Sequence, residues 1–287
     1  MRYAIIQTAD LGRAGRMKIL IRGAGDLASG IACRLHRCGF FVVMTEIPVP
    51  TTVRRTVAFS RAVYENMVKV EDITGVLCSS MEEIEEALSK DQVAVVVDEV
   101  CRIRKEFNPA VVVDAIIAKK NLGTRITDAD IVIGVGPGFT AGEDCHAVVE
   151  TKRGHDLGRC IWKGSAFPNS GVPGMIGGYD KERIIRAVKN GIFHPAVTIG
   201  TVVKQNDVVG YVDDTPVLAE VGGVVRGLLQ EGVTVCSGMK SGDIDPRGVI
   251  QHCYTISDKA SAIGGGVLEA VLSLTKKSLT EKERVLQ

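Results

Sequence analysis

A glycine-rich stretch near the start of the chain constrains the fold more than any other feature. An apolar run at 19–21 leads into a G-x-G-x-x-A pattern at 23–28, and a second apolar run at 40–44 is soon followed by an acid. In dinucleotide-binding units such glycines allow close phosphate approach, the small residue allows helix packing, and the acid holds a ribose. Five residues are therefore candidate contacts of a nucleotide-bearing cofactor: Gly23, Gly25, Asp26, Ala28 and Glu46.

The surrounding pattern predicts an α/β fold. Leu27, Ile31 and Leu35 recur on one helix face, and Gly39 is a typical helix stop. Continuous apolar runs predict strands buried on both faces, and hence a Rossmann-like, mostly parallel sheet. These runs lie at 93–97, 110–113 and 131–133, with further helical patterns at 53–64 and 81–88 and a short strand at 67–70.

Several polar groups follow the predicted strands. Asp98, Asp114 and a second glycine loop at 134–142 should lie at the carboxyl edge of the sheet, where ligands bind in open parallel sheets. Gly136 and Gly138 of that loop are further candidate cofactor contacts. Lys119 should end a helix after Asp114, where it would either meet an anion or simply interact with the helix dipole.

The pattern divides the chain into four parts. Residues 1–16 form a loose N-terminal extension, 17–191 a Rossmann-like domain, 192–255 a β-rich, barrel-sandwich-like domain, and 256–287 a C-terminal helix and tail. Before that helix, the glycines at 264–266 would form either a flexible joint or an anion-binding turn.

The densest polar constellation follows the second glycine loop. It contains Asp144, His146 and His155, which are candidate acid–base residues, and Arg153, a candidate cofactor contact. Their spacing matches no standard zinc pattern, so we expect no metal. The alternative is a structural role, with His146 hydrogen-bonded and Cys145 acting as a small buried apolar group.

A second polar turn lies in the β-rich part, at 240–248. Asp243 and Arg247 are candidate cofactor contacts there, and the alternative is an Asp–Arg pair that only holds the loop. Cys236 and Cys253 flank the region, and we expect two buried thiols rather than a redox pair.

Composition excludes several classes of function. The 287 residues carry 35 basic and 34 acidic side chains, so no nucleic-acid or membrane surface is indicated. Eight cysteines without a C-x-x-C pair, and no apolar run long enough to cross a bilayer, predict a cytoplasmic protein with reduced thiols. The strand pattern is equally compatible with a monomer and a homodimer.

Taken together, the motifs resemble those of the YqeB-type accessory proteins of selenium-dependent molybdenum hydroxylases. The first motif is also similar to the nucleotide-fold part of the XdhC accessory factors. The motifs lie, in order, at Gly23–Gly30, Gly136–Gly142, Glu150–Arg159, Gly171–Gly174, Lys240–Arg247 and Ile256–Ala260.

The resemblance implies a maturation factor that binds a molybdopterin-dinucleotide-type cofactor or assists its loading with selenium or sulfur. Its partners would be the hydroxylase or other maturation proteins. One alternative is an NAD(P)-dependent oxidoreductase with His146 as proton donor. Another is a non-catalytic docking protein whose β-rich part binds a hydroxylase.

Overall fold

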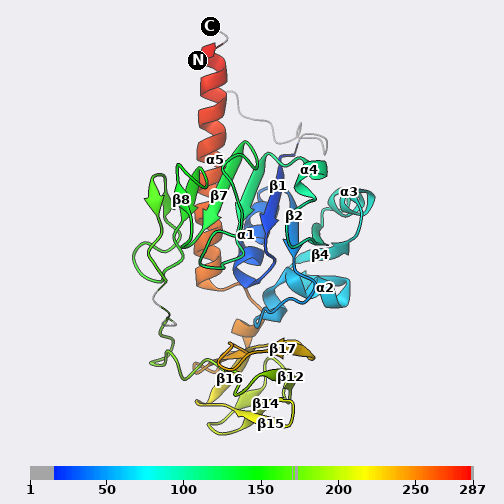
Figure 1. Ribbon diagram of the computed structural model, residues 1–287, viewed down its shortest axis with the longest axis vertical. Helices are drawn as coiled ribbons and strands as arrows, with labels where there is room; N and C mark the ends of the chain where they lie inside the picture. Colours follow the sequence, from blue (N-terminus) through cyan, green and yellow to red (C-terminus); the bar gives the residue numbers. More distant parts are fainter. Residues whose placement is uncertain (1–15, 170, 172–173, 286–287) are drawn as a thin grey trace.

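The computed structural model describes residues 16–169, 171 and 174–285, with side chains described up to residue 276. The predicted loose extension at 1–16 lies outside this part except for Arg16, and the Gly171–Gly174 motif is described only at its two ends. Figure 1 shows two parts, an α/β part and a smaller β-rich part below it.

A nine-stranded sheet forms the centre of the α/β part, in the order β10-β9-β7-β6-β1-β2-β5-β4-β3. All neighbours in it pair in parallel except the two edge pairs, β10–β9 and β3–β4. The predicted α/β class with a mostly parallel sheet is confirmed. The strands are β1 (Lys18–Arg22), β2 (Phe41–Glu46), β3 (Met67–Val70), β4 (Ile73–Cys78), β5 (Val93–Val97), β6 (Val111–Asp114), β7 (Ile131–Val135), β9 (Ala147–Val149) and β10 (Cys160–Ile161).

Helices cover both faces of this sheet, as the continuous apolar runs predicted. Side chains such as Ile19 and Ile21 pack under α1 (Asp26–Arg37) and α5 (Asp258–Val285), while Leu20 belongs to the opposite core under α3 (Met81–Ser89).

The helix predicted at 53–64 is broken into short turns, namely η2 (Arg55–Val57), η3 (Phe59–Arg61) and α2 (Ala62–Glu65). The remaining short elements are α4 (Arg104–Phe107), β8 (Thr140–Ala141) and β11 (Gly164–Ser165).

The helix predicted after Asp114 is wrong, because the chain from 115 to 130 forms an irregular loop. Ile117 and Lys119 have φ angles of 62° and 64°, which an α-helix cannot contain. Asn121 supplies the loop's hydrogen bonds instead, since its side chain donates to the Thr124 carbonyl and accepts from the Thr124 N–H. Polar side chains thus replace the backbone pairing that a helix would have provided.

The glycines at 264–266 lie inside α5, so the predicted joint or anion-binding turn is also wrong. They let α5 approach its neighbours closely. A Cβ on Gly266 would lie 2.0 Å from the Gly158 carbonyl oxygen, and one on Gly264 would lie 3.1 Å from that of Gly30. Among the described residues, no helix is both long and apolar enough to span a bilayer.

The β-rich part contains two antiparallel sheets around a second apolar core. The four-stranded sheet has the order β15-β14-β12-β17 and the three-stranded sheet the order β13-β16-β18. Their strands are β12 (Gly191–Pro195), β13 (Val202–Val203), β14 (Val208–Val212), β15 (Thr215–Leu218), β16 (Gly223–Leu228), β17 (Val233–Val235) and β18 (Gly242–Asp245). The chain then passes through η4 (Ile250–Cys253) into α5, which starts beside the β-rich part and runs along the α/β part (Figure 1).

Candidate functional site

The first glycine turn joins β1 to α1 at the carboxyl edge of the sheet. Gly23 has a φ of +92°, and a Cβ there would lie 3.0 Å from the Ala115 carbonyl oxygen. Gly25 precedes α1, which has no side-chain cap. Ala28 is buried under the turn. The turn therefore has the predicted shape, and its first glycine is required by close packing against the chain after β6.

Glu46 is placed next to this turn but is already hydrogen-bonded to it. Its carboxylate accepts the Ala24 N–H at 3.0 Å and the Ile47 N–H at 2.9 Å. Burial raises the pKa of Glu46, although these two hydrogen bonds act in the opposite direction. One carboxylate oxygen thus stabilises the turn between β1 and α1, and the other stabilises the backbone directly after β2.

The segment after β2, which includes Arg54 and Ser60, connects the glycine turn to the β-rich part. Ser60 donates its N–H to the Ala24 carbonyl, and Arg54 lies 3.6 Å from the Asp26 carboxylate. The Arg54 guanidinium also donates to the carbonyls of His252, at 3.0 Å, and Thr255, at 3.2 Å. One buried arginine therefore connects the start of α1 to the segment that leads into α5.

The strand β18 carries two buried aspartates that face three arginines. Arg183 and Arg226 both donate to Asp243, and the Arg226 Nε lies 2.8 Å from its Oδ2. Asp245 accepts from Arg247 at 2.6 Å and from Arg226 at 3.4 Å. Burial opposes ionisation of Asp245, but the hydrogen bonds from Arg247 outweigh it and lower its pKa to about 2. The predicted alternative, an Asp–Arg paired turn, is therefore present at Asp245 and Arg247.

A further ion pair joins the loop after β9 to the start of α5. Arg153 makes two hydrogen bonds to Asp258, of 2.6 and 2.9 Å. The Arg153 hydrogen bonds and charge hold the pKa of Asp258 well below its usual range. Gly174 lies against Arg153, and its carbonyl accepts from Arg183 at 2.9 Å.

We call these charged residues, with two nearby lysines, the junction cluster. It comprises Asp26, Arg54, Arg153, Arg183, Arg226, Lys240, Asp243, Asp245, Arg247, Asp258 and Lys259, which are seven bases and four acids. Each acid has an arginine partner, whereas neither Lys240 nor Lys259 has an ion pair or side-chain hydrogen bond to any described residue. The cluster thus keeps an excess of positive charge.

Both lysines are crowded by protein. Burial lowers the pKa of Lys240, and the nearby charges of Asp243 and Asp26 only partly oppose this effect. Burial also lowers the pKa of Lys259, and the neighbouring charge of Arg153 adds to it. Lys240 nevertheless keeps an exposed surface and Lys259 is half-buried.

The predicted catalytic residues lie outside the junction cluster. The ring Nδ1 of His146 accepts the Val132 N–H at 3.0 Å, near the start of β7. The Asp144 carboxylate accepts from the Thr140 N–H at 2.8 Å and from Asn121 at 3.1 Å. His155 is exposed. His146 and Asp144 are therefore engaged in holding backbone segments together.

The second glycine loop also has a packing role. Gly138 lies against the backbone of Lys120, where a Cβ would approach to 2.6 Å, and Gly136 lies against Thr151. Lys119 lies in the irregular loop after β6 and is exposed. Of the two thiols near the β-rich turn, Cys253 is buried but Cys236 is exposed, so the expectation of two buried thiols is wrong for Cys236.

Only Asp26, Arg153, Asp243 and Arg247 of the junction cluster were candidate site residues. Sequence reasoning missed the other seven members: Arg54, Arg183, Arg226, Lys240, Asp245, Asp258 and Lys259. One signal was available, because Arg226 interrupts an apolar strand, Val224-Val-Arg-Gly-Leu228. A buried charge in such a strand needs a partner. No local sequence pattern indicated that Arg54 or Lys259 would lie in the junction cluster.

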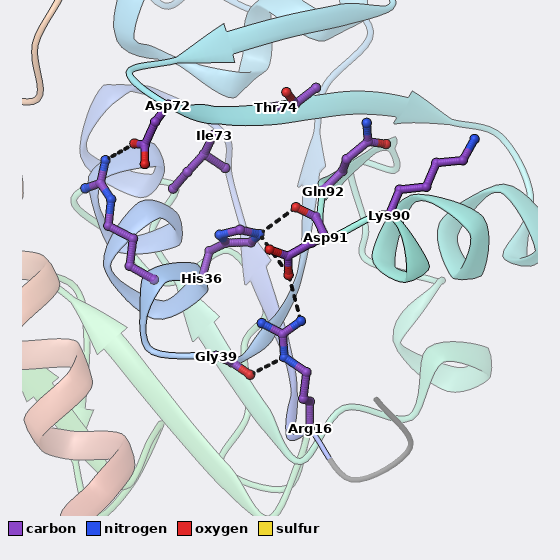
Figure 2. A pocket seen from close by; sticks show the side chains of 10 residues that line it. Arg16, His36, Gly39, Asp72, Ile73, Thr74, Lys90, Asp91 and Gln92 are labelled. Atoms are coloured by element: carbon purple, nitrogen blue, oxygen red, sulfur yellow. Dashed lines mark hydrogen bonds and ion pairs between the residues drawn. The ribbon is translucent and has the colours of Figure 1, made fainter. Parts of the chain in front are cut away.

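A separate polar pocket of about 440 Å³ lies at the amino edge of the sheet. Figure 2 shows Asp91 between His36 and Arg16, with the Arg16 Nη1 at 2.7 Å from its carboxylate. Arg37 pairs with Glu71 and Asp72 on the other side. Among the described residues, no group of three or more His, Cys, Asp or Glu side chains is arranged to hold a metal.

Comparison with known proteins gives one strong sequence match. The chain is 47% identical over 274 residues to YqeB of Escherichia coli K12, itself an uncharacterized protein. The match covers 96% of this chain but only 51% of YqeB, so the chain spans about half the length of that relative. No family model matches.

Solved structures are similar only distantly. An aspartoacylase family protein of Mesorhizobium loti is 9% identical over 80% of this chain and 85% of its own, with a TM-score of 0.26. A succinylglutamate desuccinylase/aspartoacylase of Rhodobacter sphaeroides is 19% identical over 23% of this chain and 22% of its own, with a TM-score of 0.21. Scores this low support no conclusion about fold or activity. The sequence match therefore shows that the chain is similar to YqeB over the half of YqeB that it spans.

Proposed function

We propose that the protein is an accessory factor in the maturation of a selenium-dependent molybdenum hydroxylase. In this proposal it binds a molybdopterin-dinucleotide-type cofactor at the junction cluster, or assists the loading of that cofactor with selenium or sulfur. The observation that carries the proposal is convergence. Motifs from distant parts of the chain, represented by Asp26, Arg153, Arg247 and Asp258, meet in the junction cluster, which holds more basic than acidic side chains.

The charge of the junction cluster suits a ligand that carries phosphate groups. A dinucleotide form of the cofactor contributes a diphosphate, and the excess positive charge of the cluster attracts such an anion. Glu46 is less suited to the ribose contact that its position suggested, because both of its oxygens already accept backbone N–H groups. The cofactor is cargo in this proposal, and its redox chemistry belongs to the hydroxylase.

The strand order supports the finer interpretation of the fold. The chain moves outward from β1 through β2 to one side and from β6 through β7 to the other, so the order reverses between β1 and β6. This is the switch point at which Rossmann-like folds bind ligands. We accordingly interpret the α/β part as Rossmann-like and the two antiparallel sheets as barrel-sandwich-like.

The test is deletion and complementation in an organism that makes such a hydroxylase. We expect the deletion strain to accumulate hydroxylase protein that lacks selenium or its complete cofactor, measured by elemental analysis of the purified enzyme. The native chain should restore selenium content and activity. Normal hydroxylase in the deletion strain would contradict the proposal.

Calorimetry with purified protein separates the alternatives. We expect binding of molybdopterin cytosine dinucleotide and none of NAD(H) or NADP(H). Tight NADP(H) binding with turnover of a carbonyl substrate would favour the oxidoreductase instead. Binding to the hydroxylase without binding to any cofactor would favour the docking protein.

A further inference from the structure

We propose that a pocket at the carboxyl end of β9 binds a flat heteroaromatic ring that carries N–H donors beside a carbonyl group, as pterin and guanine do. The pocket is lined by residues of the Glu150–Arg159 motif and of the segment around β11. The inference rests on the proposed function for the identity of the whole ligand, and it concerns only the group that this pocket takes.

The pocket has the size and lining of a small-molecule site. Its volume is about 360 Å³, and such sites have volumes of about 300–1,000 Å³ and mostly apolar walls with a few polar groups. Ile161, Ala166, Phe167 and Pro168 supply the apolar lining. Glu150 also lines the pocket and directly follows β9. The pocket therefore lies at the carboxyl edge of the central sheet, where open parallel sheets bind their ligands.

Phe167 provides a surface on which a flat ring can stack. The residue is 50% exposed, and the Lys152 ammonium lies 4.9 Å from the centroid of its ring. The Phe167 N–H donates to the Glu150 carboxylate at 2.8 Å, which holds the ring close to that acid. Aromatic side chains bind flat heterocycles by stacking, because every base has a π-face. Phe167 therefore suits a planar ligand better than an aliphatic one.

Glu150 gives the pocket a hydrogen-bond acceptor with a negative charge. Its buried carboxylate accepts the N–H groups of Thr151 and Lys152 at Oε1 and that of Phe167 at Oε2. A carboxylate offers about four acceptor positions, so one position at Oε2 remains. All three of these donors are neutral backbone groups, which leave the negative charge in place. The acid therefore favours a ligand with N–H donors and disfavours an anionic group.

Two further residues supply donors to the same pocket. Arg159 lies 2.9 Å from the Asp156 carboxylate through its Nη1, and its side chain is largely exposed. A guanidinium has five N–H donors, so the pair with Asp156 leaves several for a ligand. The Ser165 hydroxyl forms a hydrogen bond of 3.1 Å with Thr140 and adds a group that both donates and accepts. Arg159 and Ser165 therefore suit a carbonyl oxygen of the ligand.

A stacking surface, an anionic acceptor and nearby donors together match the edge of a 2-amino-4-oxopyrimidine ring. That edge presents N–H groups next to a carbonyl oxygen, and pterin and guanine share it. The pocket also shares a loop with the junction cluster, because Arg153, three residues after Glu150, pairs with Asp258. A ring bound in the pocket leaves the basic side chains of the cluster to the charged part of the same ligand.

The experiment is isothermal titration calorimetry of the purified full chain with pterin and with quinoxaline. Quinoxaline is a flat two-ring molecule of similar size that lacks both the N–H donors and the carbonyl group. We expect pterin to bind at least tenfold more tightly than quinoxaline. Equal affinities, or no binding of pterin, would overturn the proposal. This comparison tests Glu150 without a mutation, since Glu150→Gln would place an amide N–H against the backbone N–H groups.

Two substitutions test the pocket itself. Phe167→Ala removes the stacking surface and should weaken pterin binding about tenfold. Ser165→Trp places a large side chain in the pocket and should abolish binding. Both residues are exposed, so we expect both variants to fold, with melting temperatures near the native value. Tyr211→Ala is the matched control, because this exposed aromatic residue lies on β14 of the β-rich part.

Unchanged pterin affinity in Phe167→Ala would overturn the assignment to this pocket, even if Ser165→Trp failed to fold. Guanosine and cytidine then identify the source of the ring. Tighter binding of pterin than of either nucleoside would assign the pocket to the pterin end of a cofactor, and tighter binding of guanosine would assign it to a nucleobase. Tightest binding of cytidine, which lacks the shared edge, would overturn the proposal.

These measurements use no hydroxylase, so their failure is distinguishable from failure of the proposed function. A chain that matures the hydroxylase although its pocket binds no pterin or guanosine would refute only the assignment of this pocket.

Discussion

The two edges of the central sheet carry similar charged residues but use them differently. At the amino edge, Arg16 and Arg37 pair with exposed carboxylates around a polar pocket (Figure 2). Beside the carboxyl edge lies the junction cluster, in which Asp243 and Asp245 of β18 are buried and pair with arginines. The first arrangement is a solvated surface. The second is a mostly buried ionic network.

The largest expected effect is loss of the buried acid at the carboxyl edge. Asp243→Asn would leave Arg183 and Arg226 without their shared counter-charge. Breaking a buried ion pair on one side costs about 3–5 kcal/mol, so we expect that loss in the free energy of unfolding by urea. A loss below about 1 kcal/mol would mean that the two edges do not differ as described.

The close packing of α5 should give the next largest effect. Gly266→Ala places a Cβ 2.0 Å from the Gly158 carbonyl oxygen and should cost about 3 kcal/mol, measured by thermal or urea unfolding. Gly265→Ala is the control, because nothing lies within 4 Å of its Cβ. It should instead stabilise the helix by about 0.5–1 kcal/mol. Similar losses in both variants would show that packing is not what the glycines provide.

Acid should weaken the carboxyl edge through Asp245. Its pKa is lowered to about 2, below the value in an unfolded chain, so its contribution is fully present above about pH 4 and is lost as pH falls toward 2. Arg247→Gln removes the main hydrogen-bond donor, and we expect the stability of this variant to fall less steeply over that range. An unchanged pH slope, measured by urea unfolding at several pH values, would contradict the assignment.

The smallest effect should come from the amino edge. Asp72 is exposed and pairs with Arg37, which is itself partly exposed, so Asp72→Asn should leave the free energy of unfolding by urea nearly unchanged. Salt should reduce even this difference, because water and ions screen the pair. A loss comparable to that of Asp243→Asn would remove the distinction between the two edges.

Much of the architecture followed from local patterns in the sequence. The apolar runs at 93–97 and 131–133, the α1 face carried by Ile31 and Leu35, and the stop at Gly39 all depend on residues close together in the chain. The helix predicted for the loop after β6 was wrong. Its conformation depends on hydrogen bonds made by the Asn121 side chain, which a helical spacing of apolar residues does not reveal.

The site depended on contacts that no local pattern contains. The sequence by itself determined the glycine turn, the parallel strands, and the acids and bases of each motif, because these follow from backbone sterics and apolar spacing. Only the tertiary structure decided that Arg54 would meet a carbonyl 198 residues away, and that α5 would bring Asp258 against Arg153. Ionic pairing is set by distance in space, so the fold alone determines which charges are paired.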